Sequence, residues 1–328
     1  MSDPAGEISA VAALALGVIE RAAVTPAYGR LLRAIAESHI ATTAARPERR
    51  GFGIELPLLA ARAVGGAEDR AFMLAAAILL LEAGIFALDH LMDDELDGPL
   101  AELPRAAVLT GAVSFISFLP HLAIGDLPAP PALRAYLAKT LAEGMAAIAA
   151  GQAGEAGTSL DSPPSPSEVE RSIAGKTGAR RALYARLGAA GAGAAPAAID
   201  ALAAYGHALG MARQIGSDID DLFGGDDSRD IAAGACTLPL ACFFATASSD
   251  EAEALRADVA AARRGEPTLA AVRRRLRDGG ALRAALQRQE AFCALARRHL
   301  RDIDAPVAIT RRLEAHVAQI SLGGASHG

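Results

Sequence analysis

Apolar residues recur at helical spacing along almost the whole chain, and short stretches rich in Gly and Pro separate the apolar segments. Examples of these breaks are "TPAYG", "GDLPAPP", "RRGEPT" and "DAPVA", whereas runs of β-branched residues are scarce. Ala, Leu, Arg and Glu, which favour helices, dominate the segments between the breaks. The pattern therefore predicts one all-α domain over residues 1–328, with roughly a dozen helices.

Local signals refine this picture at three places. "SEVE", Ser167 to Glu170, has the form of a capping box and predicts a helix start. The Pro- and Ser-rich stretch 157–166 before it predicts a mobile loop. Residues 1–6 and 323–328 are expected to be loose termini.

The most apolar segment, Ala71–Leu88, is about as long as the ~18 residues that raise the question of a membrane span. Glu82 interrupts it, a charged trio precedes it and Asp89 follows it. A helix at the centre of a large α-protein has the same appearance. We therefore expect this segment to be a core helix, and we do not expect the chain to be an integral membrane protein.

Composition narrows the possible functions. The 328 residues are 52% hydrophobic, and Lys+Arg 32 against Asp+Glu 38 give a net charge of −6. No basic stripe with interleaved aromatic residues occurs, so nucleic acid is not expected as a partner. The three cysteines are odd in number and lack metal-ligand spacing, and the N-terminus has no cationic segment before an apolar one. These features predict a cytoplasmic protein.

The first candidate site is "DDELD", Asp93 to Asp97, directly behind the apolar segment. On a continuous helix Asp89, Asp93 and Asp97 would form one stripe, with Asp94 beside Asp93. Mg²⁺ takes one or two carboxylates together with substrate phosphates, so the cluster suits Mg²⁺ held against a diphosphate. The alternative is a solvated helix end, where the helix dipole makes an acidic run unfavourable.

A second acidic cluster, in "RQIGSDIDDLFGGDDSRD", favours the metal site over the solvated helix end. It contains Asp218 and Asp221 before a Gly-rich turn. Two acidic helix ends in one all-α domain predict a shared pocket, where metal ions join both banks to one polyanion.

An ordered series of motifs resembles the trans-polyprenyl diphosphate synthases, within the class I isoprenoid synthases. "DDELD" matches their first DDxxD motif, and "QIGSDIDD" resembles the second, with Ser217 in place of an aspartate. "IAGKTGARRAL" resembles the helix with a Lys-Thr pair, and Gly151–Gln152 lies where relatives often have Gly-Gln. The resemblance runs from about Arg49 to the C-terminal helices. It implies a helical bundle around an apolar cavity, acting on an allylic prenyl diphosphate, and a homodimer.

The resemblance also implies residue roles. The expected Mg²⁺ ligands, for three ions bound together with the diphosphate, are Asp93, Asp94, Asp97, Ser217, Asp218 and Asp221. The expected substrate-binding residues are Gln152, Lys176, Thr177, Arg180 and Gln214. The expected catalytic residues are Asp89, Lys176 and Gln214. Asp89 has no counterpart in the family pattern: it extends the metal bank, pairs with His90 or an arginine, or acts as a base, unless the helix is rotated toward a buried arginine.

The chain departs from the family where a second diphosphate should bind. Phe52 and Glu55 stand where the G-K-x-x-R-P motif has lysine and arginine, and Ala235 stands where a later lysine is expected. "GPLAELPR" replaces an arginine pair after Asp97. The loss of these cations argues against isopentenyl diphosphate as co-substrate.

The prediction is therefore a terpene synthase-like enzyme that ionises one allylic diphosphate and cyclises, eliminates or transfers the resulting carbocation. The alternatives are a chain-elongating polyprenyl diphosphate synthase and a non-catalytic partner subunit of one.

Overall fold

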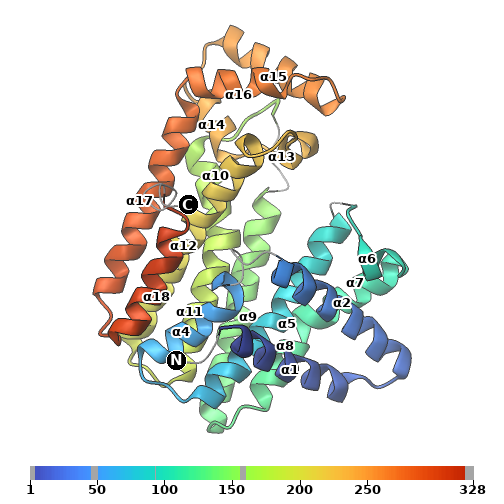
Figure 1. Ribbon diagram of the computed structural model, residues 1–328, viewed down its shortest axis with the longest axis vertical. Coiled ribbons are helices and arrows are strands. Elements are labelled where there is room, and N and C mark those ends of the chain that lie inside the picture. Colours follow the sequence, from blue (N-terminus) through green and yellow to red (C-terminus); the bar gives the residue numbers. More distant parts are fainter. Residues whose placement is uncertain (1–3, 46–50, 93, 156–159, 322–328) are drawn as a thin grey trace. The chain divides into compact units, whose positions relative to one another are not determined.

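The structure is a computed structural model that describes residues 4–45, 51–92, 94–155 and 160–321. Within these ranges every regular element is a helix and no strand occurs, which confirms the all-α prediction. Figure 1 labels the helices. The chain divides into two compact units. Unit 1 is formed by Met1–Ala142, Leu183–Ala203 and Asp302–Leu313, and unit 2 by Glu143–Ala182, Ala204–Arg301 and Glu314–Gly328. Whether they form the single predicted domain stays a prediction.

The helices distribute over the units in three groups. Unit 1 contains α1 (Pro4–Ala22), α2 (Pro26–Ala45), η1 (Gly51–Glu55), α4 (Leu56–Ala63), α5 (Glu68–Met92), α6 (Gly98–Ala101), α7 (Arg105–Ser117) and α8 (Leu119–Gly125). Unit 2 contains α10 (Pro166–Ile173), η2 (Ala174–Gly178), α13 (Arg229–Ala233), α14 (Leu238–Phe244), α15 (Ser249–Arg263), α16 (Leu269–Asp278) and α17 (Ala281–Arg301). The division falls inside α9 (Pro131–Glu155), α11 (Ala179–Gly191), α12 (Pro196–Phe223) and α18 (Val307–Ala318).

Helix α5 is the core of unit 1. It packs against α1, α2, α4, α7 and α8, and residues on every side of it are buried. Glu68–Met92 and Arg105–Gly125 are long and apolar enough to cross a membrane, but core helices pass the same test, and 67% of the apolar window of α5 is buried within the protein. The structure thus agrees with the prediction of a core helix.

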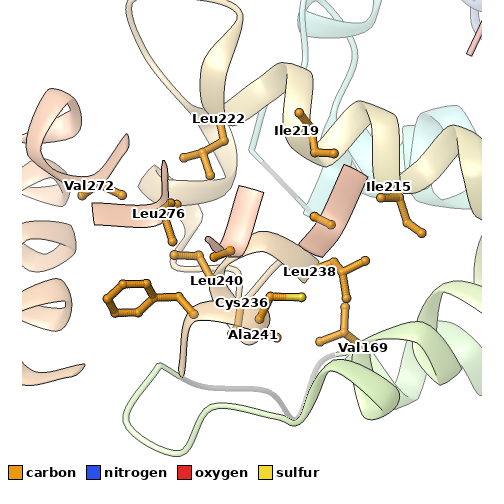
Figure 2. Close-up of a cluster of buried hydrophobic side chains, with 14 of the residues drawn as sticks. Val169, Ile215, Ile219, Leu222, Cys236, Leu238, Leu240, Ala241, Val272 and Leu276 are labelled. Carbon is orange, nitrogen blue, oxygen red and sulfur yellow. The ribbon is translucent and has the colours of Figure 1, made fainter. Parts of the chain in front are cut away.

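Unit 2 has an apolar core of its own, shown in Figure 2. Leu238 and Leu240 from α14 pack there with Leu276 from α16 and with residues of α10 and α12. On α12 this core contains Ile215, Ile219 and Leu222.

Two local predictions shift in register. The capping box before α10 is formed by Ser165 and Glu168, so the prediction of a start at Ser167 is wrong by two residues. Pro166 explains the shift, because proline suits the first helical position and leaves Ser165 as the N-cap. Helix α1 begins at Pro4, inside the segment expected to be loose. Most of the predicted mobile loop has no regular element, and its residues 157–159 lie outside the described ones, as do 323–328.

Candidate active site

The second acidic cluster lies on one face of α12. Its members are spaced three and four residues apart, which places them along one face of a continuous helix: they are Gln214, Ser217, Asp218 and Asp221. The adjoining side of the same turns is buried in the apolar core of unit 2 through Ile215, Ile219 and Leu222. The sequence pattern that predicted this face is therefore realised as a helix.

Three of the predicted site residues form one hydrogen-bonded chain. The Thr177 hydroxyl donates to Gln214 Oε1 at 2.9 Å, and Gln214 Nε2 donates to Asp218 Oδ1 at 2.8 Å. Thr177 is 3% exposed and Asp218 is 6% exposed. A carboxylate this deeply buried is costly unless hydrogen bonds or a cation offset its charge. The chain therefore orients the Gln214 amide and supplies one hydrogen bond to the buried Asp218 carboxylate.

Thr177 and Lys176 belong to η2, a π-helical turn that glycines allow to pack tightly. A Cβ on Gly151 of α9 would lie 2.3 Å from the carbonyl carbon of Gly175. A Cβ on Gly210 of α12 would lie 2.6 Å from the backbone carbonyl oxygen of Thr177. The backbones of α9 and α12 thus press directly on η2. Single π-helical turns are frequent at functional sites. Sequence reasoning recognised both Gly-containing motifs but not that they touch.

The remaining predicted substrate-binding residues lie close by in sequence. Gln152 follows Gly151 on α9, and Arg180 lies one turn beyond Lys176, at the start of α11; both side chains are partly exposed. His207 packs against Gly178, and its burial, together with nearby His299, lowers the pKa of its imidazole, which favours the neutral form.

Asp221 serves the turn that follows α12. Its carboxylate accepts hydrogen bonds from the Ser228 hydroxyl at 2.6 Å and from the backbone N–H of Asp230 at 3.1 Å. Arg273 of α16 holds the same turn by donating to the carbonyl oxygens of Leu222 and Gly225, each at 2.5 Å. Sequence reasoning missed Arg273, because nothing local marks an arginine that caps a helix from a distant element. The role of Asp221 as a metal ligand stays a prediction.

The first acidic cluster does not continue the helix. Helix α5 ends at Met92, Asp94 adopts a left-handed conformation (φ 59°), and Asp97 is extended at the N-cap of α6. The predicted single stripe of Asp89, Asp93 and Asp97 is therefore wrong. Neighbouring carboxylates repel one another and oppose the helix dipole at a C-terminus, and aspartate tolerates the left-handed region. Asp93 itself lies outside the described residues.

Arg105 stabilises this helix end. Its guanidinium pairs with the Asp94 carboxylate and donates to the Leu91 carbonyl oxygen at 2.7 Å. A cation that reaches the last carbonyls of a helix offsets its dipole. Asp94 and Asp97 remain exposed.

Asp89 is partly exposed on α5. Its expected pairing with His90 has no support in the position of the imidazole. His90 Nδ1 lies 3.0 Å from the Phe86 carbonyl oxygen, and the imidazole contacts the Phe86 ring at a tilted angle with centroids 4.1 Å apart. The other roles considered for Asp89 stay predictions.

Glu55, which replaces a cation of the family motif, belongs to a network of ion pairs in unit 1. Arg312 lies 3.3 Å from Glu55 and 3.7 Å from Glu7, and Arg62 lies 2.9 Å from Glu7. Arg62 also donates two hydrogen bonds of 2.8 Å to Glu68. The carboxylates of Glu7, Glu55 and Glu68 thus form ion pairs with the guanidinium groups of Arg62 and Arg312, and Glu55 pairs with Arg312.

The outer pair of this network leads to a prediction on acid stability. The Arg62 hydrogen bonds hold the pKa of Glu68 below its ordinary value. Stability from such a lowered pKa is present above the unfolded pKa and is lost as the pH falls through the folded one. Because Glu68 is 54% exposed, Glu68→Gln should lower the free energy of unfolding by only about 0.5–1 kcal/mol at pH 7.

Urea denaturation at pH 7 and at about pH 3 checks this expectation. The difference between wild type and Glu68→Gln should vanish at the lower pH. An equal difference at both values would contradict it. Glu102→Gln, on an exposed residue, is the control.

The donor set can be tested for its fit to a metal. Within the described residues, no group of three or more His, Cys, Asp or Glu side chains could hold a metal ion. Asp94 and Asp97 in unit 1 and Asp218 in unit 2 supply hard oxygen donors. Mg²⁺ typically takes one or two protein carboxylates plus substrate phosphates rather than a closed protein cage. These residues therefore fit an ion that arrives with a diphosphate, and their predicted meeting in one pocket stays a prediction.

A sequence model of the Polyprenyl synthetase family matches residues 104–276, just over half of the chain. The protein belongs to the polyprenyl synthetase family. Its members are soluble, Mg²⁺-dependent, prenyltransferase-like enzymes of isoprenoid biosynthesis, which confirms the resemblance inferred from the motifs. Comparison with curated protein sequences found no match.

Several solved structures share the fold of this chain. Geranylgeranyl pyrophosphate synthetase from Pyrococcus horikoshii Ot3 has a TM-score of 0.81 at 21% identity, over 96% of this chain and 95% of that chain. A decaprenyl diphosphate synthase from Rhodobacter capsulatus has 0.79 at 20%, over 96% and 95%. Geranylgeranyl pyrophosphate synthase from Corynebacterium glutamicum, complexed with isoprenyl diphosphate and magnesium, has 0.73 at 19%, over 98% and 99%.

Proposed function

We propose that this protein binds an allylic prenyl diphosphate with Mg²⁺ and transfers its prenyl group as a carbocation. The observation that carries the proposal is the chain Thr177–Gln214–Asp218 beside Lys176 on η2. It joins two motifs that the family resemblance treats separately, and both lie in unit 2.

The residues have distinct tasks in this proposal. Lys176 holds the diphosphate as a point charge. Thr177 fixes the amide of Gln214, so that Gln214 meets the substrate in one orientation. Mg²⁺, for which we propose the Asp218 carboxylate as a ligand, would neutralise charge that develops on the leaving diphosphate.

Isopentenyl diphosphate is the first candidate for the acceptor. The structures that resemble this chain carry the names of synthases of geranylgeranyl and decaprenyl diphosphate, and the family is that of the polyprenyl synthetases. These comparisons favour the chain-elongating alternative over the terpene synthase-like enzyme predicted from the missing motifs.

A specific observation favours a second candidate, ionisation without elongation. Glu55 replaces a cation of the motif and forms an ion pair with Arg312 at 3.3 Å. A carboxylate at this position repels a second diphosphate, and its pairing reduces the positive charge that Arg312 offers to an anion. In this case the carbocation eliminates, cyclises or reacts with another acceptor.

One experiment separates the candidates. The protein is incubated with Mg²⁺ and geranyl, farnesyl or geranylgeranyl diphosphate, each with and without isopentenyl diphosphate. Longer diphosphates formed only with isopentenyl diphosphate support elongation, and a hydrocarbon or alcohol formed without it supports the second candidate. The absence of any turnover would contradict both and favour a non-catalytic partner subunit.

We further propose that the protein is a cytoplasmic homodimer that uses the outer face of α7 and α8. Large apolar side chains are exposed there: Leu109 48%, Val113 54%, Phe118 40% and Leu122 45%. No Asp, Glu, Lys or Arg occurs between Ala106 and Gly125. Exposed apolar patches of this kind mark interaction sites, and an uncharged face complements a second copy of itself.

Val113→Glu should weaken the dimer at least ~30-fold, because burying an unpaired charge in an interface costs about 2 kcal/mol or more. Size-exclusion chromatography with light scattering over a dilution series measures the change. Val307→Glu, on a valine of α18 that is 67% exposed, is the matched control and should leave the dimer intact. A monomeric wild type would contradict the proposal.

A further inference from the structure

Helix α17 of unit 2 carries an excess of positive charge (Figure 1). Its 21 residues include five arginines and a single acidic residue, Glu290, in a chain whose net charge is −6. One of the five, Arg288, forms an ion pair with Glu170 of α10 at 2.8 Å. The other four form what we call the arginine stripe, and among the described residues none of them has an ion-pair or hydrogen-bond partner: Arg283, Arg297, Arg298 and Arg301.

The arginine stripe lies along the outer face of α17. The face toward the core is buried and contains Ala281, Ala285, Gln289, Cys293, Ala296 and Leu300. Arg283 and Arg301 are separated by about five turns, so they share one line along the helix at a spacing of about 27 Å. Both are exposed, as is Arg298, and Arg297 is partly exposed.

Helix stability accounts for only part of this stripe. Arg298 and Arg301 lie in the last turn, where a cation offsets the helix dipole. Arg283 lies in the first turn, where a cation opposes the dipole. Glu290 accepts a hydrogen bond from the Ser321 hydroxyl at 3.0 Å. The position of Arg283 therefore points to a role in binding rather than in stabilising the helix.

The exposed positions between the arginines carry small or polar side chains: Gln287, Ala291 and Ala294. The centre of a protein–protein interface usually contains large apolar or aromatic anchors. A line of guanidinium groups without such anchors suits a surface that offers many anions and requires no pocket for a side chain.

We propose that the outer face of α17 docks on an anionic lipid bilayer. The inference uses the proposed function in one respect, the nature of the product. A prenyl diphosphate, or the alkene or alcohol formed from it, carries an apolar chain that partitions into a bilayer. Nucleic acid also offers anions but has no apolar phase to receive this chain, so the bilayer is the favoured partner.

The strength of the interaction follows from the charges. Each arginine close to an anionic bilayer strengthens binding about 5-fold. Because the stripe has no large apolar side chain to insert among the lipids, the attraction is electrostatic and is screened by salt.

The test is sedimentation of the full-length protein, without substrate, with lipid vesicles. One set contains phosphatidylglycerol and phosphatidylcholine in equal parts, and the other contains phosphatidylcholine alone. Wild type should bind only the anionic vesicles and should be released at about 1 M salt, where the Debye length is about 3 Å. The double variant Arg283→Gln/Arg301→Gln should need about 30-fold more lipid for half-maximal binding, because two arginines are lost.

Two further variants complete the design. Arg30→Gln/Arg311→Gln removes two exposed arginines of α2 and α18 and should bind as wild type does. Arg283→Lys/Arg301→Lys keeps both charges and should stay within about 2-fold of wild type, since lysine and arginine are equally attracted to an anionic surface. Weak binding by this lysine variant would contradict a purely electrostatic docking face.

Equal binding of wild type and Arg283→Gln/Arg301→Gln, or equal binding to both kinds of vesicle, would overturn the inference. Failure of wild type to bind the anionic vesicles would overturn it as well and would leave the proposed function standing. A DNA duplex that displaces the protein from the vesicles at equal phosphate concentration would assign the face to nucleic acid instead. Vesicle binding requires no turnover, so a protein that binds vesicles but releases no diphosphate from any substrate would refute the proposed function and leave the docking face in place.

Discussion

Asp218→Asn is expected to lower kcat/KM for the allylic diphosphate by at least ~100-fold, because even residues that only support a metal ligand contribute 10–100-fold. Asp218 is 6% exposed and receives the Gln214 amide at 2.8 Å. Asparagine keeps the size of the side chain and can still accept this hydrogen bond through its oxygen. What the substitution removes is the negative charge.

The measurement is diphosphate release at increasing Mg²⁺, together with thermal denaturation. The variant should need more Mg²⁺ for half-maximal rate, and the melting temperature shows whether it is folded at the assay temperature. Asp226→Asn, on an exposed residue of the following turn, is the matched control. Equal rates and equal Mg²⁺ dependence for both variants would remove Asp218 from the metal site.

The pattern of α12 shows what a sequence can predict. Gln214, Ser217, Asp218 and Asp221 are separated by three and four residues, so any continuous helix places them on one face. This prediction depended only on the helix being continuous. The apolar residues between them are buried in the core of unit 2 and stabilise the helix over these turns.

The end of α5 shows the limit. The same spacing argument predicted a stripe through Asp97, but the helix stops at Met92. Whether a helix continues through adjacent carboxylates depends on small competing terms, among them the dipole, the mutual repulsion and the Arg105 contacts to Asp94 and Leu91. Arg105 is close in sequence, yet no periodicity indicates where its guanidinium lies.

Side-chain partners that are distant in sequence could not be predicted at all. Glu55 was identified as an anomaly from its motif, but its partner Arg312 comes from a helix at the other end of the chain. Glu82 was taken as an interruption that argued against a membrane span, and only the structure supplies Tyr184. Hydrogen bonds between distant elements depend on the whole packing arrangement, which one sequence does not specify.

Gly151→Ala should destabilise unit 2 by about 1–3 kcal/mol, the usual cost of overpacking. A Cβ at this position would lie 2.3 Å from the Gly175 carbonyl carbon and 2.4 Å from the Lys176 nitrogen. Both contacts are to backbone, so no side chain can rotate away to relieve them. Either α9 or η2 must move.

The activity change should exceed what lost stability explains, because η2 carries Lys176 and Thr177. A shift of this turn lengthens the 2.9 Å hydrogen bond from Thr177 to Gln214, and misplacing a positioning group by about 1 Å can cost 100-fold in rate. Gly125→Ala is the control, since a Cβ there meets nothing within 4 Å.

Urea denaturation and kcat/KM at 25 °C, where both variants are still folded, separate the two effects. A stable Gly151→Ala protein with normal kcat/KM would show that the close approach of α9 to η2 has no part in catalysis. A folded but inactive one would place the tight packing of these glycines among the requirements for positioning Lys176 and Thr177.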